Sequence, residues 1–383
     1  MYIHTPCDYN EYLSKKYNTN VYLKREDLQP IRSFKIRGAY NKIIKNKSDN
    51  LKIVCASAGN HGMGVAYVCN KLNIPCVIII PSNTPLQKSN SLSKLNCEII
   101  FNGTTVQESI KQAKIYSKEN NYLFIHPYDD LDIIEGQSTI YNELKDMNFN
   151  YISVCVGGGG LLSGIMSKFN NENIIACEPE TSPNLIPCLR NGKPMEIDIT
   201  DTFVDGATVS VIGDNNWEII KKRLDKLKHY VIDNGLICSM IVELYQNCGI
   251  IMEPAGALSV CALEMCKFDK NDKIVCIISG GNNDLTRYPE ILERSLRYKE
   301  IRHYYLIEFP QRPGMLKEFV MKVLDIEDDI IRFEYVKKTN SSCGSALVGI
   351  ETKNINRLND NLKKYKFKYS YLNNDNLIYK YII

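Results

Sequence analysis

Lys35 stands out in this sequence as a residue whose surroundings favour chemistry. It lies in the stretch Ser33-Phe34-Lys35-Ile36-Arg37-Gly38-Ala39-Tyr40, which opens a segment whose apolar residues recur at helical spacing. The pattern predicts Lys35 in the first turn of a helix, with Ser33 as the N-cap. The positive end of the helix dipole and the nearby charge of Arg37 both favour the neutral amine, which is a nucleophile. The alternative is that Lys35, one of 47 Lys and Arg residues, only solvates a helix end.

A loop of small polar residues forms a candidate anion site. The apolar run 53–56 leads into a predicted helix over residues 65–70. Small residues at a helix start leave backbone N–H groups free, which suits a carboxylate. His61 is also a candidate acid or base, although a histidine near a helix start is more often hydrogen-bonded structure. The residues of this loop are Ser57, Ala58, Gly59, Asn60, His61 and Gly62.

Four consecutive glycines form a candidate phosphate site. Gly157, Gly158, Gly159 and Gly160, followed by Leu161, come after the apolar run 151–156. Glycine lets the backbone approach a phosphate closely, although one such turn also serves an ordinary strand-to-helix connection. The spacing matches neither the dinucleotide G-x-G-x-x-G fingerprint nor a P-loop, so a ligand with a single phosphate is expected. A third polar loop, Ser279-Gly280-Gly281-Asn282-Asn283, follows the run 274–278.

The part of the chain from residue 52 to about 284 has the pattern of an α/β fold. Short β-branched runs alternate there with helical stretches, which predicts an open parallel sheet with helices on both faces. Ligands of such sheets bind beyond the carboxyl ends of the strands, where the three loops lie. The predicted strands are 53–56, 76–80, 98–101, 123–126, 151–156, 174–177 and 273–278, and the predicted helices include 106–118 and 238–248.

The character of the sequence changes beyond Arg302. About 80 residues predict a small α+β unit without a catalytic cluster, which we interpret as a regulatory or assembly module. Its predicted strands are 304–309, 329–337, 346–351 and 377–382, with helices over 315–324 and 355–364.

Composition excludes several other classes of function. The net charge of +3 gives no case for nucleic acid or an acidic membrane surface. No run approaches the length of a membrane span and no signal-peptide pattern is present at the N-terminus, so a cytoplasmic protein is expected. The 14 cysteines include no Cys-x-x-Cys pair, which favours reduced thiols. Glu178, Glu180 and Asn184 are better interpreted as a solvated loop than as a cation site, so no metal is expected.

An activated lysine, a single-phosphate loop, a carboxylate loop and an α/β sheet together suggest pyridoxal phosphate acting on an amino acid. The sequence resembles the threonine ammonia-lyases (threonine dehydratases) of fold type II over essentially its whole length. The C-terminal unit is similar to the single ACT-like domain of their short biosynthetic form. The motifs that carry the resemblance are Tyr22-Leu23-Lys24-Arg25-Glu26-Asp27, the Lys35 stretch, Ala56 to His61, Gly157 to Leu161, Glu253-Pro254-Ala255-Gly256-Ala257, Ser279 to Asn282 and Phe309 to Gly314.

The resemblance implies a role for each loop. Lys35 would be the Schiff-base lysine and the base that removes the α-proton. Gly157 to Gly160 and the Leu161 amide would cradle the phosphate, and Ser279 would face the pyridine nitrogen. Asn60 would hydrogen-bond the ring's 3-hydroxyl, and Ser57, Ala58, Gly59, Asn60 and His61 would hold the substrate carboxylate.

The resemblance also implies the organisation and the reaction. A catalytic domain would span residues 1–300, with a smaller subdomain at about 35–135, and an ACT-like regulatory domain would span 301–383. The reaction would convert threonine to 2-oxobutanoate and ammonia for isoleucine synthesis, with isoleucine as effector and a homo-oligomer, a dimer or tetramer, as the assembly. A serine dehydratase or racemase is the alternative, but racemases carry a second serine where this chain has Ala58. A non-catalytic amino-acid sensor is a third possibility, which the presence of Lys35, Asn60 and Ser279 disfavours.

Overall fold

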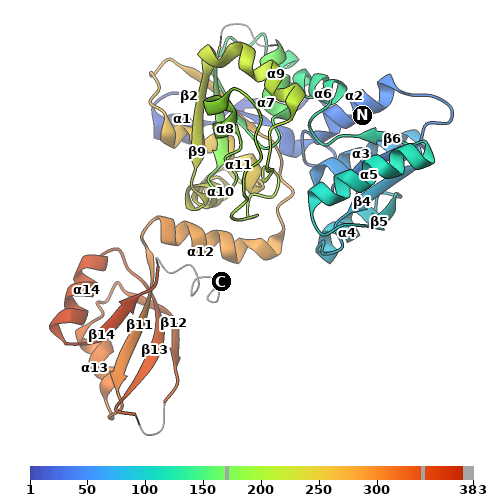
Figure 1. The fold of residues 1–383 in the computed structure, drawn as a ribbon. Coiled ribbons are helices and arrows are strands. Elements are labelled where there is room, and N and C mark those ends of the chain that lie inside the picture. The colour runs from blue at the N-terminus through green and yellow to red at the C-terminus, as the bar shows by residue number, and fades with distance from the viewer. Residues whose placement is uncertain (169–171, 338–340, 374–383) are drawn as a thin grey trace. The chain divides into compact units, whose positions relative to one another are not determined.

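The chain folds into two compact units in the computed structural model, which describes residues 1–168, 172–337 and 341–373. The first unit spans Met1–Asn283 and the second spans Asp284–Ile383. Figure 1 shows that the first unit contains two sheets with their helices, whereas the second contains one antiparallel sheet. No helix in the described ranges combines the length and the apolar character needed to cross a membrane.

A six-stranded sheet forms the larger part of the first unit. Its order is β1-β2-β10-β7-β8-β9, and all neighbouring strands are parallel except β1 and β2. The central strands are buried on both faces, which explains why they appear in the sequence as continuous apolar runs. The strands are β1 (Cys7–Tyr9), β2 (Asn20–Arg25), β7 (Tyr151–Cys155), β8 (Asn173–Pro179), β9 (Leu227–Ile232) and β10 (Lys273–Ile278).

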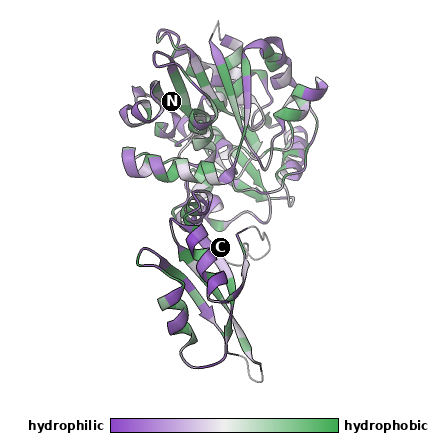
Figure 2. Ribbon diagram, turned by 90° about the vertical axis from the view of Figure 1, so that its left-hand side faces the viewer, coloured by the Kyte–Doolittle hydropathy of each residue, from purple (hydrophilic) through white to green (hydrophobic). Residues whose placement is uncertain are grey.

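A four-stranded parallel sheet, in the order β5-β4-β3-β6, forms the smaller part of this unit. Helices α3 and α5 pack on its strands, and α4 packs on α3 and β5. Figure 2 shows that the helices on the outside of the first unit carry both hydrophilic and hydrophobic residues. The strands are β3 (Ile53–Ala56), β4 (Cys76–Ile80), β5 (Glu98–Phe101) and β6 (Leu123–Ile125).

The helices of the first unit cover the faces of both sheets. Helix α11 packs on four strands of the larger sheet, β7, β8, β9 and β10, and α2 packs on both α3 and α6. The α-helices are α1 (Glu11–Tyr17), α2 (Lys35–Lys45), α3 (Asn60–Leu72), α4 (Leu86–Ser93), α5 (Val106–Asn120), α6 (Leu131–Asn142), α7 (Gly160–Lys168), α8 (Leu185–Asn191), α9 (Asp214–Ile220), α10 (Asn234–Cys248) and α11 (Pro254–Met265). Two 3-10 helices are η1 (Glu26–Leu28) and η2 (Lys221–Lys226).

The second unit is an antiparallel sheet with helices, in the order β12-β13-β11-β14. Its core contains Tyr305, Ile307 and Phe309 of β11 together with Phe319 of α13. The elements are η3 (Leu285–Arg287), α12 (Tyr288–Tyr298), β11 (Arg302–Pro310), α13 (Met315–Lys322), β12 (Asp329–Tyr335), β13 (Cys343–Glu351), α14 (Ile355–Lys364) and β14 (Lys368–Tyr371).

The α/β prediction is confirmed, and four of the predicted strands, β3, β4, β5 and β10, have the expected bounds. The prediction missed β1, β9 and β14, whose residues are largely exposed or half-buried and therefore give no apolar run. It also began α3 at residue 65, whereas the helix starts at Asn60. The predicted strand 377–382 lies outside the described residues.

Candidate active site

Lys35 is the first residue of α2, as the sequence predicted, but the expected N-cap is wrong. The N-cap position belongs to Phe34, which makes no side-chain capping bond. Ser33 lies one residue earlier, where its hydroxyl accepts a long hydrogen bond of 3.5 Å from the Lys35 amide. The chain is held there because Ser33 pairs with Gly280 in a β-bridge and the Phe34 amide donates to the Ser279 carbonyl at 3.0 Å.

The amine of Lys35 loses its proton far more readily than the amine of an ordinary lysine. Its Nζ donates to the Pro127 carbonyl at 3.0 Å, and its removal from water lowers the pKa of Lys35 from 10.5 to about 8. Cys155 and Glu253 oppose this shift weakly. The predicted influence of Arg37 is wrong, because the Arg37 guanidinium is neutralised by carboxylates of its own and does not contribute to the shift. Burial is therefore what makes Lys35 nucleophilic.

The carboxylate loop lies between β3 and α3, at the carboxyl end of its strand. The Gly59 amide donates to the Ser57 hydroxyl at 3.2 Å, which fixes the turn. A Cβ added at Gly59 would meet no heavy atom within 4 Å, so open space lies in front of the loop. Because α3 begins at Asn60, the loop amides lie at the N-terminus of a helix of 13 residues, a site that favours anions.

Asn60 is held in one orientation by two partners from other loops. Its Nδ2 donates to Oε1 of Glu253 at 2.7 Å, and its Oδ1 accepts from Nδ2 of Asn282 at 2.7 Å. One amide hydrogen of Asn60 has no role in these two bonds and can donate to a ligand. Burial, with a further contribution from the charge of Asp205, raises the pKa of Glu253 to about 7. Asn60, Glu253 and Asn282 come from three different segments of the chain, and their hydrogen bonds connect the two sheets.

His61 is hydrogen-bonded structure, the more common of its two interpretations. Its side chain is buried and Nε2 lies 3.1 Å from the Ile125 carbonyl. Burial and the nearby charge of Lys35 lower the pKa of His61 to about 3, so the imidazole is neutral. His126 behaves similarly, because burial lowers its pKa to about 4 and its Nδ1 accepts the Asp129 amide at 2.8 Å. Two neutral imidazoles therefore lie close to Lys35.

The glycine loop joins β7 to α7, as expected for a phosphate site. Gly159 has a φ of +93°, a conformation that favours glycine, and Gly160 begins the helix. A Cβ at Gly158 would lie 2.6 Å from Cδ1 of Tyr128, so only glycine fits beside this ring. The Gly158 carbonyl accepts a hydrogen bond from Nδ2 of Asn216 at 3.0 Å. The amides in the first turn of α7 have no partner within the helix, so they can bind an anion.

Ser279 lies at the end of β10 and is buried. Its hydroxyl interacts with the thiol of Cys155, the last residue of β7, and burial raises the pKa of that thiol to about 11. The Ser279 carbonyl accepts the Phe34 amide, which places this loop directly beside the residue that precedes Lys35. A neutral hydroxyl next to a neutral thiol suits an uncharged heterocyclic nitrogen.

The interpretation of residues 178–184 as a solvated loop is wrong for two of its three residues. Glu178 and Asn184 are both fully buried, and only Glu180 is exposed. Glu178 lies in β8, where its Oε2 is 2.6 Å from Nε2 of His229 and its Oε1 accepts the Leu185 amide at 2.7 Å. Among the residues that the structure describes, no group of three or more His, Cys, Asp or Glu side chains forms a metal site.

These features fit pyridoxal phosphate. A lysine with a pKa of about 8 is suited to hold an aldehyde covalently. The glycine loop, with its space-restricted turn and free helix amides, is suited to hold a phosphate. Asn60 has a spare donor for a ring oxygen, and Ser279 offers a hydroxyl for the ring nitrogen.

Comparison with known proteins assigns the family. The family described as "Pyridoxal-phosphate dependent enzyme" matches residues 1–280 of this chain. The chain belongs to the pyridoxal-phosphate dependent enzymes. The family described as "C-terminal regulatory domain of Threonine dehydratase" matches residues 293–382.

Individual relatives of this pyridoxal-phosphate dependent enzyme are similar over all or most of its length. The chain is 43% identical over 397 residues to the biosynthetic L-threonine dehydratase of Halalkalibacterium halodurans, covering 100% of this chain and 95% of that protein. The corresponding enzyme of Staphylococcus epidermidis is 43% identical over 400 residues, covering 99% and 94%. The processed threonine deaminase isoform 2 of Solanum lycopersicum has a similar structure, with a TM-score of 0.72, 31% identity and coverage of 77% and 84%. The serine racemase of Dictyostelium discoideum has a TM-score of 0.68, 29% identity and coverage of 74% and 94%.

Sequence reasoning missed a fourth loop of the pyridoxal-phosphate dependent enzyme, residues 126–129. It follows β6, so the same rule that found the other three loops would have found it. This loop contacts Lys35 through Pro127 and the glycine turn through Tyr128. The role of Glu253 in orienting Asn60 was also missed, although its motif contributed to the family resemblance.

The pKa of Lys35 predicts how attachment of the cofactor depends on pH. A pKa lowered to about 8 means that half of the amine is neutral at that pH, and only the neutral amine attacks an aldehyde. We expect the rate at which pyridoxal phosphate attaches to the apo-protein to rise from pH 7 to 9 and then level off, as followed by absorbance. A rate that keeps rising toward pH 10.5 would contradict the pKa given to Lys35.

Proposed function

We propose that this protein is a biosynthetic threonine ammonia-lyase, which converts L-threonine to 2-oxobutanoate and ammonia in isoleucine synthesis. The observation that carries the proposal is similarity over the full length to biosynthetic threonine dehydratases, in a chain where loops of both sheets converge on Lys35. The atoms balance, because the β-hydroxyl leaves with a proton as water and one water replaces the amino nitrogen in the product.

Each loop has a proposed part in binding. The amine of Lys35 holds pyridoxal phosphate, and the amides of Gly157, Gly158, Gly159, Gly160 and Leu161 bind its phosphate at the start of α7. The hydroxyl of Ser279 bonds to the ring nitrogen, and the spare amide hydrogen of Asn60 bonds to the ring oxygen. The loop of Ser57, Ala58, Gly59, Asn60 and His61 binds the substrate carboxylate, which fits the open space at Gly59.

Proton transfer is assigned to Lys35. Bound pyridoxal phosphate supplies an electron sink for the charge that develops at the substrate's Cα. The neutral amine of Lys35, once it is free, removes the α-proton, and the Pro127 carbonyl at 3.0 Å stabilises the resulting ammonium. Ser279 has no charge, so it does not keep the ring nitrogen protonated as a carboxylate would. This weaker sink suits elimination, in which the β-hydroxyl leaves early and little carbanion charge accumulates.

Two alternatives, a serine racemase and a non-catalytic amino-acid sensor, fit the residues of this chain less well. Serine racemases need a second group on the opposite face of the cofactor, and the methyl group of Ala58 cannot transfer a proton. Dehydration is therefore favoured over racemisation. A non-catalytic amino-acid sensor would not need the lowered pKa of Lys35.

We also propose a regulatory arrangement. The catalytic domain spans residues 1–300 with a smaller subdomain at about 35–135, and an ACT-like domain spans 301–383, which the regulatory-domain match at 293–382 supports. The effector is isoleucine, bound between ACT-like domains of a homo-oligomer, a dimer or tetramer, because each chain has one such domain. A cytoplasmic location fits this biosynthetic role.

One set of saturation curves tests substrate and regulation together. We expect kcat/KM for L-threonine to exceed that for L-serine, D-serine to give no pyruvate, and isoleucine to shift the threonine curve to higher concentration. Release of 2-oxobutanoate from threonine excludes the sensor. A faster reaction with serine, or formation of D-serine, would replace the proposed activity, and an unchanged curve with isoleucine would overturn the proposed effector.

A further inference from the structure

The chain passes between the two sheets of the first unit twice. The first passage runs from β2 through η1 and α2 to β3, and the second returns from β6 through α6 to β7. Lys35 lies in the first passage, and the Pro127 carbonyl that it contacts lies in the second. The place of Lys35 relative to the loops of both sheets therefore depends on how the two passages are joined.

Helices α2 and α6 of the two passages touch through their backbones. A Cβ at Gly136 of α6 would lie 2.5 Å from the Gly38 Cα and 2.6 Å from the Arg37 carbonyl oxygen. A Cβ at Gly38 would in turn lie 2.9 Å from the Ile133 carbonyl oxygen. This contact leaves no room for a side chain between α2 and α6. The side chains next to Gly38 and Gly136 therefore determine whether the two helices keep their positions relative to each other.

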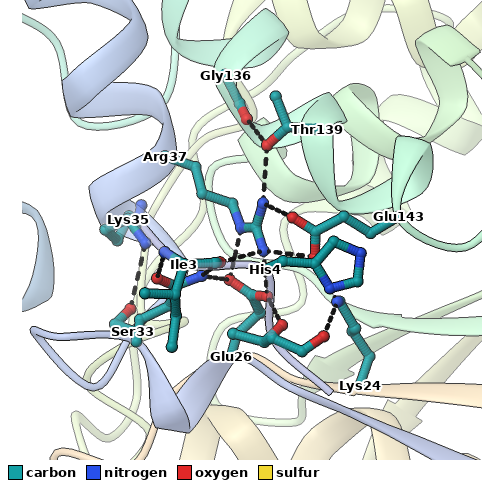
Figure 3. Close-up of polar contacts among 12 residues, drawn as sticks. Ile3, His4, Lys24, Glu26, Ser33, Lys35, Arg37, Gly136, Thr139 and Glu143 are labelled. Atoms are coloured by element: carbon teal, nitrogen blue, oxygen red, sulfur yellow. Dashed lines mark hydrogen bonds and ion pairs between the residues drawn. The ribbon is translucent and has the colours of Figure 1, made fainter. Parts of the chain in front are cut away.

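Arg37, two residues after Lys35, joins the passages at this crossing (Figure 3). Its Nε donates to Glu26 at 2.7 Å in the first passage. Its Nη1 donates to Glu143 at 2.6 Å and to Thr139 at 3.0 Å, both in the second passage. Its Nη2 donates to the other oxygen of each carboxylate, at 2.8 Å for Glu26 and 3.0 Å for Glu143. Two forked ion pairs with one guanidinium fix distance and angle together.

The cluster is buried and its charges are balanced. Arg37, Lys24 and Glu26 are fully buried, and the side chain of Glu143 is 9% exposed. Lys24 supplies the second cation, with Nζ 2.5 Å from Glu143 and 2.6 Å from the Thr5 carbonyl. Hydrophobic packing alone would cost less desolvation than this arrangement, so geometric specificity is the property that it adds.

We propose that Arg37 is a positioning residue for Lys35: its two forked ion pairs lock the passages between the sheets and thereby fix the amine of Lys35 against the loops of both. The inference rests on the proposed role of Lys35. The Arg37 guanidinium bonds to Glu26, Glu143, Thr139 and the Ile3 carbonyl, none of which has a proposed part in binding. The substitution Arg37→Lys would keep the positive charge but lose the paired hydrogen bonds to each carboxylate.

The test compares Arg37→Lys with Lys45→Met, a matched control. Lys45 also joins α2 to α6, through Asp132 at 3.1 Å and through Glu135, but it is exposed and lies far from the first turn. The first readout is the rate at which pyridoxal phosphate attaches to the apo-protein, because it needs no substrate. We expect a fall of at least about tenfold in Arg37→Lys and a change of less than twofold in Lys45→Met.

The second readout is the kinetic isotope effect on kcat with threonine deuterated at Cα. A misplaced base makes proton removal more rate-limiting, so the isotope effect should rise in Arg37→Lys, whereas a smaller folded fraction would lower kcat and leave it unchanged. If Arg37→Lys fails to fold, both measurements are made on the double variant Lys24→Met/Glu143→Met instead. This variant removes one cation and one carboxylate of the cluster together, so its charges stay balanced. Unchanged attachment rate in a folded variant overturns the proposal, even if the isotope effect changes. Normal attachment in the wild type without threonine turnover would instead contradict the proposed function alone.

Discussion

Replacing Lys35 with alanine should lower kcat for threonine by at least about 10³-fold, because the change removes both the general base and the covalent holder of the cofactor. The side chain is half-buried and its amine makes one hydrogen bond, to a backbone carbonyl. Its loss should therefore leave the fold intact. Initial rates of 2-oxobutanoate release measure the activity, and circular dichroism measures the fold.

Lys45→Ala is the control for the Lys35 substitution, since Lys45 lies on the same helix and faces solvent. Its activity should stay within about twofold of the wild type, as expected for an exposed ion pair. Turnover within tenfold of the wild type in Lys35→Ala would mean that another residue takes the α-proton.

Gly158→Ala should weaken binding of the cofactor by at least about tenfold and lower kcat/KM by about 100-fold, since small displacements of a bound reactant have effects of this size. The new Cβ would overlap the Tyr128 ring, and this ring packs against the turn that is proposed to hold the phosphate. Either the ring or the turn must move. Titration of the apo-protein with pyridoxal phosphate gives the affinity.

A double-mutant cycle identifies the cause of the Gly158 effect. Tyr128→Ala makes room for the new methyl group, so the double variant should bind the cofactor more tightly than Gly158→Ala alone. Additive losses in the cycle would show that the collision with Tyr128 is not the reason for the change.

The sequence predicts the strand-end loops well because buried parallel strands are continuous apolar runs that end in turn residues. The strand 53–56 and the strand 273–278 have their expected bounds for this reason. The start of α3 was missed because Asn60, His61 and two glycines have low helix propensity, and packing in the first unit overrides it.

Contacts between residues far apart in the chain could not be predicted from the sequence. Arg37 was interpreted as a charge acting on its neighbour Lys35, but one of its two carboxylate partners, Glu143, is 106 residues away. The desolvation of Lys35 depends in the same way on elements far along the chain, so the sequence predicted the right direction of its pKa shift for the wrong reason. Glu178 seemed solvated because its partner His229 belongs to a strand that the sequence did not predict.

Trapping the cofactor on the protein tests the role of Lys35 most directly. The purified protein, loaded with pyridoxal phosphate, is reduced with borohydride and digested, and the modified peptide is identified by mass spectrometry. We predict a single pyridoxyl group on the peptide that contains Lys35. A pyridoxyl group on another lysine, or none on a protein that releases 2-oxobutanoate from threonine, would contradict the assignment of Lys35 as the residue that holds the cofactor.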